Sequence, residues 1–205
     1  MIYTFVAGFL EDNNYLLVDE ETKEAILIDC TLPNDEIDKK INELGVKLKY
    51  ILLTHGHFDH ICGVNYYREK FGAISCCHKD DKELVENIND FVRMFQIRGD
   101  FEVQKIDKFL SDGDEINFGT KKIKVIHTAG HTKGCVCYLL DDVLFSGDTL
   151  FKGSVGRTDL PDGSFETLKD SITNKIFTLE GDLKIYTGHG EATTLSYEKK
   201  YNNFL

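Results

Sequence analysis

Three of the chain's seven histidines lie within residues 55–60, in the segment THGHFDH that directly follows the apolar run YILL. His55 and His57 are two residues apart, so an extended segment directs both side chains to the same side. Asp59 and His60 follow where the chain turns toward the next expected helix. Three imidazoles this close would repel one another's protons unless a metal ion replaced those protons. We therefore interpret this segment as metal binding.

Further side chains of the same kind follow three other apolar segments. KIKVI leads into HTAGHTKG, VLFS leads into GDTLF, and LKIY leads into TGHG. Because sites in α/β proteins gather where the carboxyl ends of strands meet, we expect His131, Asp148 and His189 to join the first segment. Imidazole and carboxylate suit zinc, iron or manganese, and no thiolate is needed. The pattern fits two metal ions, with Asp148 bridging them and His131 and His189 completing their shells.

The other histidines and the cysteines have more ordinary interpretations. His78 has no partner motif and is expected to be a satisfied polar residue. His127 is expected to be the same, with a role behind a metal ligand as the alternative. The cysteines form neither zinc-finger pairs nor a disulfide framework, so we expect reduced thiols that pack as small apolar residues. Cys62 stands apart because it lies close to His60. The six cysteines are Cys30, Cys62, Cys76, Cys77, Cys135 and Cys137.

Strand and helix patterns alternate along the chain, which predicts a layered α/β protein with a mixed sheet arrangement. The helix predictions rest on caps and apolar stripes: PNDEIDKKINELG ends at Gly45, and SFETLKDSITNKIFTL begins at Ser164. Two more helices are expected over 61–71 and 80–88, and 89–105 is ambiguous and could form a loop near the site. Strands are expected over 2–6, 13–18, 25–29, 47–53, 73–77, 122–127, 135–140, 142–146 and 183–187.

Length and charge restrict the class of protein. A chain of 205 residues is long enough for one substantial core, and we expect a single domain over 1–205. The net charge of −11 argues against nucleic acid or an anionic membrane as partner. No apolar run approaches the roughly 20 residues that a membrane helix needs. The first residues lack the basic start of a secretory signal, so we expect a cytoplasmic protein.

Taken in order, the motifs T-H-x-H-x-D-H at 54–60, H-T-x-G at 131–134, S-G-D-T-L-F at 146–151 and G-H-G at 188–190 resemble those of the metallo-β-lactamase fold superfamily. The resemblance implies a four-layer αββα sandwich with a binuclear site along one edge. By the family pattern one metal is held by His55, His57 and His131. The second is held by Asp59, His60 and His189, and Asp148 bridges the two.

Details within the superfamily narrow the expected activity. The family's β-lactamases lack the bridging aspartate, so Asp148 argues against antibiotic hydrolysis. LFKGSVGRTDLPDGS and GHGEATTLSYEKKYNNFL resemble small bacterial glyoxalase II-like (hydroxyacylglutathione hydrolase-like) hydrolases. Arg157 falls where longer glyoxalase II enzymes place a lysine on glutathione. It is a candidate for binding a substrate carboxylate, and pairing with Asp159 to brace the loop is the equal alternative.

The resemblance implies a metallo-hydrolase that cleaves a small-molecule thioester, such as S-lactoylglutathione, or an ester. A metal-bound hydroxide oriented by Asp59 would be the nucleophile. The cofactor would be two divalent ions, with zinc as the first expectation and iron or manganese as alternatives. A mononuclear-iron persulfide dioxygenase using His55, His131 and Asp148 is the leading alternative function. A lactone hydrolase and a metal-dependent binding or sensor module are further alternative functions. Oligomeric state stays open.

Overall fold

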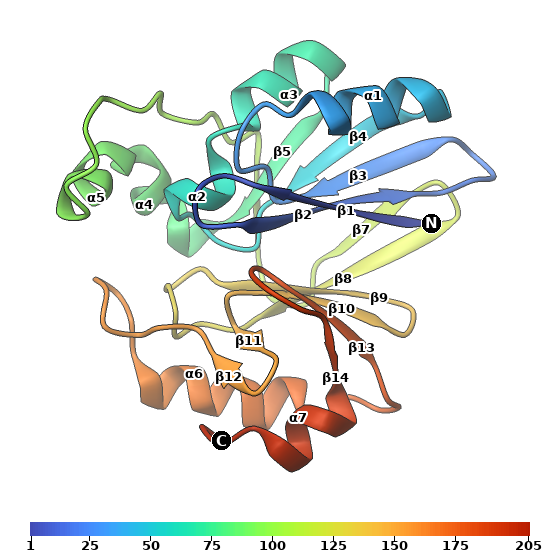
Figure 1. Ribbon diagram of the computed structural model, residues 1–205. Coiled ribbons are helices and arrows are strands. Elements are labelled where there is room, and N and C mark those ends of the chain that lie inside the picture. Colours follow the sequence, from blue (N-terminus) through green and yellow to red (C-terminus); the bar gives the residue numbers. More distant parts are fainter.

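The computed structural model describes residues 1–205. Apolar segments from the N-terminal part of the chain form a six-stranded sheet (Figure 1). Its first three strands pair antiparallel and the remaining neighbours pair parallel. The strand order is β1 (Ile2–Ala7), β2 (Asp12–Val18), β3 (Glu24–Ile28), β4 (Lys47–Leu52), β5 (Ile74–His78) and β6 (Lys108–Leu110).

The second half of the chain supplies a second six-stranded sheet below the first in Figure 1. Only β10 and β13 pair parallel within it. Its order is β14 (Thr193–Thr194), β13 (Lys184–Thr187), β10 (Val143–Gly147), β9 (Val136–Leu140), β8 (Lys121–His127) and β7 (Glu115–Phe118). The short strands β11 (Leu150–Phe151) and β12 (Ser154–Val155) form a separate hairpin.

Helices cover the outer face of each sheet (Figure 1). α1 (Asp35–Leu44) and α3 (Val64–Phe71) pack on the first sheet. α6 (Phe165–Ser171), continued by a π-helical turn over Ile172–Ile176, and α7 (Leu195–Tyr201) pack on the second. α2 (Phe58–Ile61), α4 (Lys82–Glu86) and α5 (Ile88–Met94) gather at one end of the sandwich, at the left of Figure 1, after a short 3₁₀ turn over Lys79–Asp81.

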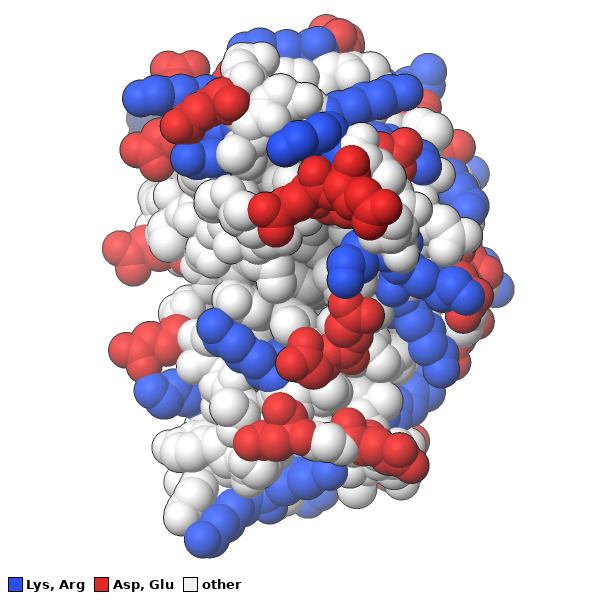
Figure 2. Space-filling model, turned by 90° about the vertical axis from the view of Figure 1, so that its right-hand side faces the viewer, with Lys and Arg blue, Asp and Glu red and all other residues white.

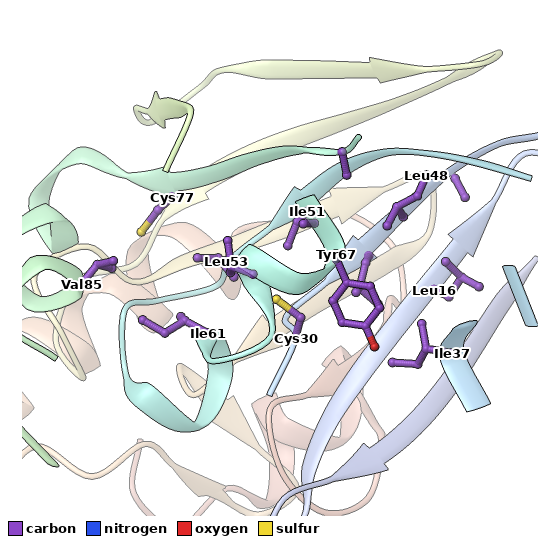
Figure 3. Packing of buried hydrophobic residues seen from close by; sticks show 14 of the residues in the cluster. Leu16, Cys30, Ile37, Leu48, Ile51, Leu53, Ile61, Tyr67, Cys77 and Val85 are labelled. Atoms are coloured by element: carbon purple, nitrogen blue, oxygen red, sulfur yellow. The ribbon is translucent and has the colours of Figure 1, made fainter. Parts of the chain in front are cut away.

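Three separate apolar clusters fill the spaces between these four layers. The first lies between the upper helices and the first sheet, where Tyr67 packs among Leu16, Ile37 and Leu48 (Figure 3). The second lies between the two sheets and the third between the second sheet and α6 and α7. Because each sheet buries apolar side chains on both faces, inner strands such as β3 (EAILI) and β9 (VCYLL) are nearly continuous apolar runs in the sequence.

Helix α1 begins and ends at capping residues that can be recognised in the sequence. The side chain of Asn34 accepts hydrogen bonds from the backbone N–H groups of Glu36 and Ile37, which caps the helix. Gly45 ends it at φ +61°, a left-handed conformation that favours glycine. Ile37 and Ile41 face the core. A capped amphipathic helix of this kind is the most local feature of the fold and therefore the easiest to predict.

All nine expected strands are present, and the four-layer αββα sandwich is confirmed. The structure adds short strands that the sequence did not indicate, β6, β7, β11, β12 and β14, and the helix α7. The segment 89–105, which the sequence left ambiguous, is helical up to Met94, where α5 ends, and irregular chain follows. Phe91 and Val92 bury on the first core, which stabilises helix there despite the weak pattern.

The surface carries both signs of charge in close alternation. On the face that lies at the right of Figure 1, basic and acidic side chains are intermixed beside a larger uncharged area (Figure 2). None of the helices combines the length and the apolar character that a bilayer crossing requires.

His78 gives the fold a specific sensitivity to acid. Burial, and then the stacked His127 ring at a centroid distance of 4.1 Å, lower the pKa of His78 from 6.5 to about 4, although the Asp80 carboxylate acts in the opposite direction. The unfolded chain therefore binds a proton at this position below about pH 6.5, and the folded chain does so only near pH 4. The free energy of unfolding should accordingly fall as the pH decreases from about 6.5 to 4.

We expect His78→Asn to reduce this loss, because asparagine can still accept the backbone N–H of Asp80 but does not titrate in this range. Urea unfolding of both chains at pH 7 and pH 5, in the presence of a chelator, measures the effect. Equal losses of stability in the two chains would show that His78 does not cause the acid sensitivity.

Candidate metal centre

The loops that follow four strands bring seven polar side chains to one point between the sheets. β4 leads to His55 and His57 and then to α2, and β8, β10 and β13 lead to the remaining segments. All seven are buried or nearly so, although Asp59 and His189 remain partly accessible. The structure thus brings together every residue that the sequence selected for this cluster: His55, His57, Asp59, His60, His131, Asp148 and His189.

His55, His57 and His131 form the first group of donors. Their donor atoms lie within 4.8 Å of one another. Nδ1 of His57 and Nε2 of His131 are 2.9 Å apart, and the His57 ring stacks on Phe91. Burial, and then the neighbouring imidazoles, hold the pKa values of His55 and His57 well below their usual range. Neutral imidazoles that converge in this way present lone pairs to a common point.

Asp59, His60 and His189 form a second group, joined by Asp12, which the sequence analysis did not select. Nε2 of His60 lies 3.3 Å from Nε2 of His189. Asp12 follows the β1–β2 turn, far from the histidine motifs in the chain. The polar run EDNN between two apolar strands was the only signal that could have drawn attention to it.

Asp148 lies between the two groups. Its Oδ1 is 3.5 Å from Nε2 of His60, and its Oδ2 is 3.6 Å from Nε2 of His131 and 3.5 Å from Nε2 of His189. Burial opposes ionisation of this carboxyl, but the surrounding imidazoles hold its pKa well below its usual range. Gly188 permits the close packing, because a Cβ there would lie 2.0 Å from Oδ1 of Asp148.

Hydrogen bonds at the outward-facing ring nitrogens orient three of the histidines. Nδ1 of His60 lies 2.9 Å from Oδ2 of Asp29. Nδ1 of His131 lies 2.7 Å from the backbone oxygen of Arg157, and Nδ1 of His189 lies 3.0 Å from that of Leu10. When each Nδ1 donates its proton outward, the Nε2 lone pair faces the cluster. Fixing the tautomer in this way is typical of histidines that bind metals.

Asp81 braces two of the ligand-bearing loops and was not selected from the sequence. Its Oδ2 accepts hydrogen bonds from the backbone N–H of Gly56 and from Oγ1 of Thr132, each at 2.8 Å. Its Oδ1 accepts from the backbone N–H of Gly134 at 2.6 Å. The carboxylate thus ties the loop that holds His55 and His57 to the loop that holds His131.

His78 and His127 lie outside the cluster. Their rings stack on each other, and neither hydrogen-bonds to any of the seven residues. The cysteines are all free thiols, and burial raises the pKa of Cys62 to about 12. These observations fit the expectation that the cysteines act as small packing residues.

An open cavity of ≈ 410 Å³ gives access to the cluster. Its floor carries donors of both groups and its walls are largely apolar and aromatic. Arg157 is the one basic residue that lines it, and its Nε and Nη2 donate to the two carboxylate oxygens of Asp159 at 2.7 and 2.8 Å. The apolar lining residues are Leu10, Phe58, Phe91, Phe95, Phe151, Val155 and Leu160.

The donor set fits a divalent metal ion. Nε2 of His55 and Oδ1 of Asp148 are buried and have no hydrogen-bond partner within the chain. Leaving buried polar atoms without partners is costly, and a cation at this point would satisfy them. Nitrogen and carboxylate oxygen are ligands that zinc, iron and manganese accept.

Comparison with known proteins agrees with this geometry. Residues 8–189 match the Metallo-beta-lactamase superfamily, and the chain therefore belongs to that superfamily. It is 35% identical to the hydroxyacylglutathione hydrolase GloC of Haemophilus influenzae, over 94% of this chain and 92% of that protein. It is 36% identical to human mitochondrial persulfide dioxygenase ETHE1, over 85% of this chain and 62% of that protein.

Solved structures are similar over nearly the whole chain. The BLEG-1 B3 metallo-beta-lactamase superposes with a TM-score of 0.92 at 33% identity, covering 100% of this chain and 99% of that one. TTHA1623 in a di-iron-bound form superposes with a TM-score of 0.88 at 30% identity, covering 99% and 100%. The family and the fold that the sequence motifs indicate are thereby confirmed.

We expect Asp81→Ala to lower the free energy of unfolding by about 3 kcal/mol, because three buried donors lose their acceptor. The variant should also bind less zinc, since the two loops lose their common anchor. Urea unfolding of the chelated chain and metal analysis after zinc reconstitution measure both effects. Asp80→Ala, at the exposed neighbouring position, is the control. A variant at Asp81 with wild-type stability and metal content would contradict the bracing role.

Proposed function

We propose that the chain is a glyoxalase II-like thioesterase that acts as a single domain and holds two divalent metal ions, with zinc as the first expectation. The observation that carries the proposal is the position of Asp148, whose two oxygens face the two groups of donors at the floor of an apolar cavity. The similarity to hydroxyacylglutathione hydrolase GloC supports the choice of reaction.

In this proposal His55, His57 and His131 would hold one ion, Asp59, His60 and His189 would hold the other, and Asp148 would be shared by both. Divalent ions bound there would supply a water of lowered pKa and polarise a carbonyl group. The reaction adds water across the thioester and yields a carboxylic acid and a thiol. The unpaired cysteines fit a reducing compartment such as the cytoplasm.

The chain's own residues position the reactants. Asp59 lines the cavity with its side chain 13% exposed, where its carboxylate can accept a hydrogen bond from the attacking water and orient it. The phenyl rings of Phe58, Phe91 and Phe95 exclude bulk water from one side of the cavity and offer an apolar surface to the acyl or thiol group. A small-molecule thioester or ester fits a cavity of this kind.

We expect protein reconstituted with zinc, and separately with iron, to hydrolyse S-lactoylglutathione, followed by the loss of thioester absorbance. Asp148→Ala should lose the activity and most of the bound metal, because both groups of donors lose the carboxylate that they share. Glu191→Ala, which removes a fully exposed carboxylate that pairs with Lys152, is the matched control and should behave like wild type. Full activity and full metal content in Asp148→Ala would contradict the proposed two-metal thioesterase.

Oxidation of a glutathione persulfide by O2 is the second candidate, favoured by the similarity to persulfide dioxygenase ETHE1. This reaction would need one iron ion, held by His55, His131 and Asp148. Oxygen uptake that depends on iron and on a persulfide, without thioester hydrolysis, would establish it. The same assay series includes a β-lactam, because one structural neighbour is a B3 metallo-beta-lactamase, and an acyl-homoserine lactone.

Arg157 provides a test of how the substrate is held. If its guanidinium binds a substrate carboxylate, Arg157→Ala should raise KM for S-lactoylglutathione several-fold with kcat nearly unchanged. Asp159→Ala should then lower KM, because it frees the guanidinium from its present partner. If the pair only braces the loop, the two variants should change KM in the same direction, and the substrate-binding role of Arg157 would be rejected.

A further inference from the structure

Asp12 is a buried carboxyl group at the edge of the metal cluster, and the chain offers its side chain no hydrogen bond. It lies at the start of β2 with an exposure of 0%, and neither side-chain oxygen has a hydrogen-bond partner. Its backbone forms an isolated bridge with His189. A buried carboxyl group without hydrogen-bond partners is disfavoured in the interior of a protein, and a cation beside it would satisfy its oxygens.

The side chain of Asp12 lies closer to His60 and His189 than the side chain of Asp59 does. Oδ1 of Asp12 lies 3.7 Å from Nε2 of His60 and 3.5 Å from Nε2 of His189. The corresponding distances from Oδ2 of Asp59 are 3.9 and 3.8 Å. Two ligands at about 2.1 Å from one tetrahedral ion lie about 3.4 Å apart. Asp12 is therefore placed at least as well as Asp59 to bind the same ion.

The outward hydrogen bonds of His60 and His189 leave one nitrogen of each ring facing Asp12. The Nδ1 atoms of His60 and His189 face Asp29 and the backbone oxygen of Leu10, which accept the ring protons. A metal ion that replaces the Nε2 protons would meet two ring lone pairs and the Asp12 oxygen at one point, and it would satisfy all three.

We propose that Asp12 is an additional carboxylate ligand of the second metal ion, beside Asp59 and Asp148. This inference rests on the two-metal arrangement proposed above. The second position then has three carboxylates and two imidazoles, while the first has three imidazoles and the shared Asp148.

The two positions consequently differ in the metal that they favour. Imidazole-rich, four-coordinate sites suit zinc, whereas additional carboxylate oxygens and a higher coordination number suit manganese and ferrous iron. Asp12 makes the second position selective for the harder ions. The charge of its carboxylate also offsets part of the positive charge that two divalent ions introduce into a buried site.

The test uses the full chain, stripped with a chelator and titrated with Zn²⁺ or Mn²⁺ by calorimetry, with metal content checked by elemental analysis. Asp12→Asn keeps the shape of the side chain and removes its charge. We expect the variant to bind the first equivalent of Zn²⁺ like wild type and to bind the second equivalent at least 10-fold more weakly, with a larger loss for Mn²⁺. In the Co²⁺-loaded variant the visible absorption of the second equivalent should intensify as the coordination number falls.

Asp19→Asn is the matched control, because Asp19 is a buried carboxylate just beyond the other end of β2 that is satisfied by Thr22 and Thr120. It should leave both equivalents unchanged. Wild-type affinity for the second equivalent in Asp12→Asn would overturn the role of Asp12 alone. A wild-type chain that binds only one equivalent would contradict the two-metal arrangement and this inference together.

A measurement on the wild-type chain covers the case in which Asp12→Asn does not fold. In a crystal structure with Mn²⁺ bound, an oxygen of Asp12 should lie at about 2.2 Å from the second ion, the distance of a coordinated carboxylate. An Asp12 oxygen beyond about 3 Å, with water between it and the ion, would overturn direct ligation.

Discussion

The structure depends on an electrostatic constraint: buried imidazoles and carboxylates meet at one point where water cannot solvate them. Asp148 is the centre of this arrangement, because its two oxygens face both groups of histidines. Burying such groups is costly in a protein interior, and a cation at this point would compensate their lone pairs and negative charges. The suitability of the cluster for a cation therefore follows from burial as much as from the identity of the residues.

The rest of the fold holds these side chains in place. The two sheets supply the strands whose carboxyl ends meet, and three apolar clusters fix the four layers around them. Behind the cluster, Asp29 and the backbone oxygens of Leu10 and Arg157 orient the rings, and Asp81 ties two loops together. Donors held by such contacts are already in position before a metal binds, which reduces the entropic cost of binding.

In the cavity above the cluster, the residues that would react with a substrate differ from those that would select it. Reactivity would come from the donors on its floor. The chain is similar both to a hydroxyacylglutathione hydrolase and to a persulfide dioxygenase, which differ in activity. Selectivity would come from the walls, where phenyl rings dominate and the single guanidinium is paired with Asp159. A fold of this superfamily therefore leaves the substrate to be decided by residues outside the metal cluster.

The sequence by itself determined the strands, the capped helix α1 and the seven clustered donors, because each is encoded in a short contiguous pattern. His55, His57, Asp59 and His60 stand within six residues, and the other three donors follow strand ends beside glycine. Only the tertiary structure decided the positions of Asp12 and Asp81 and the pairing of His189 with the backbone of Leu10. These contacts join residues far apart in the chain, and a local pattern carries no information about which distant segment will pack against it.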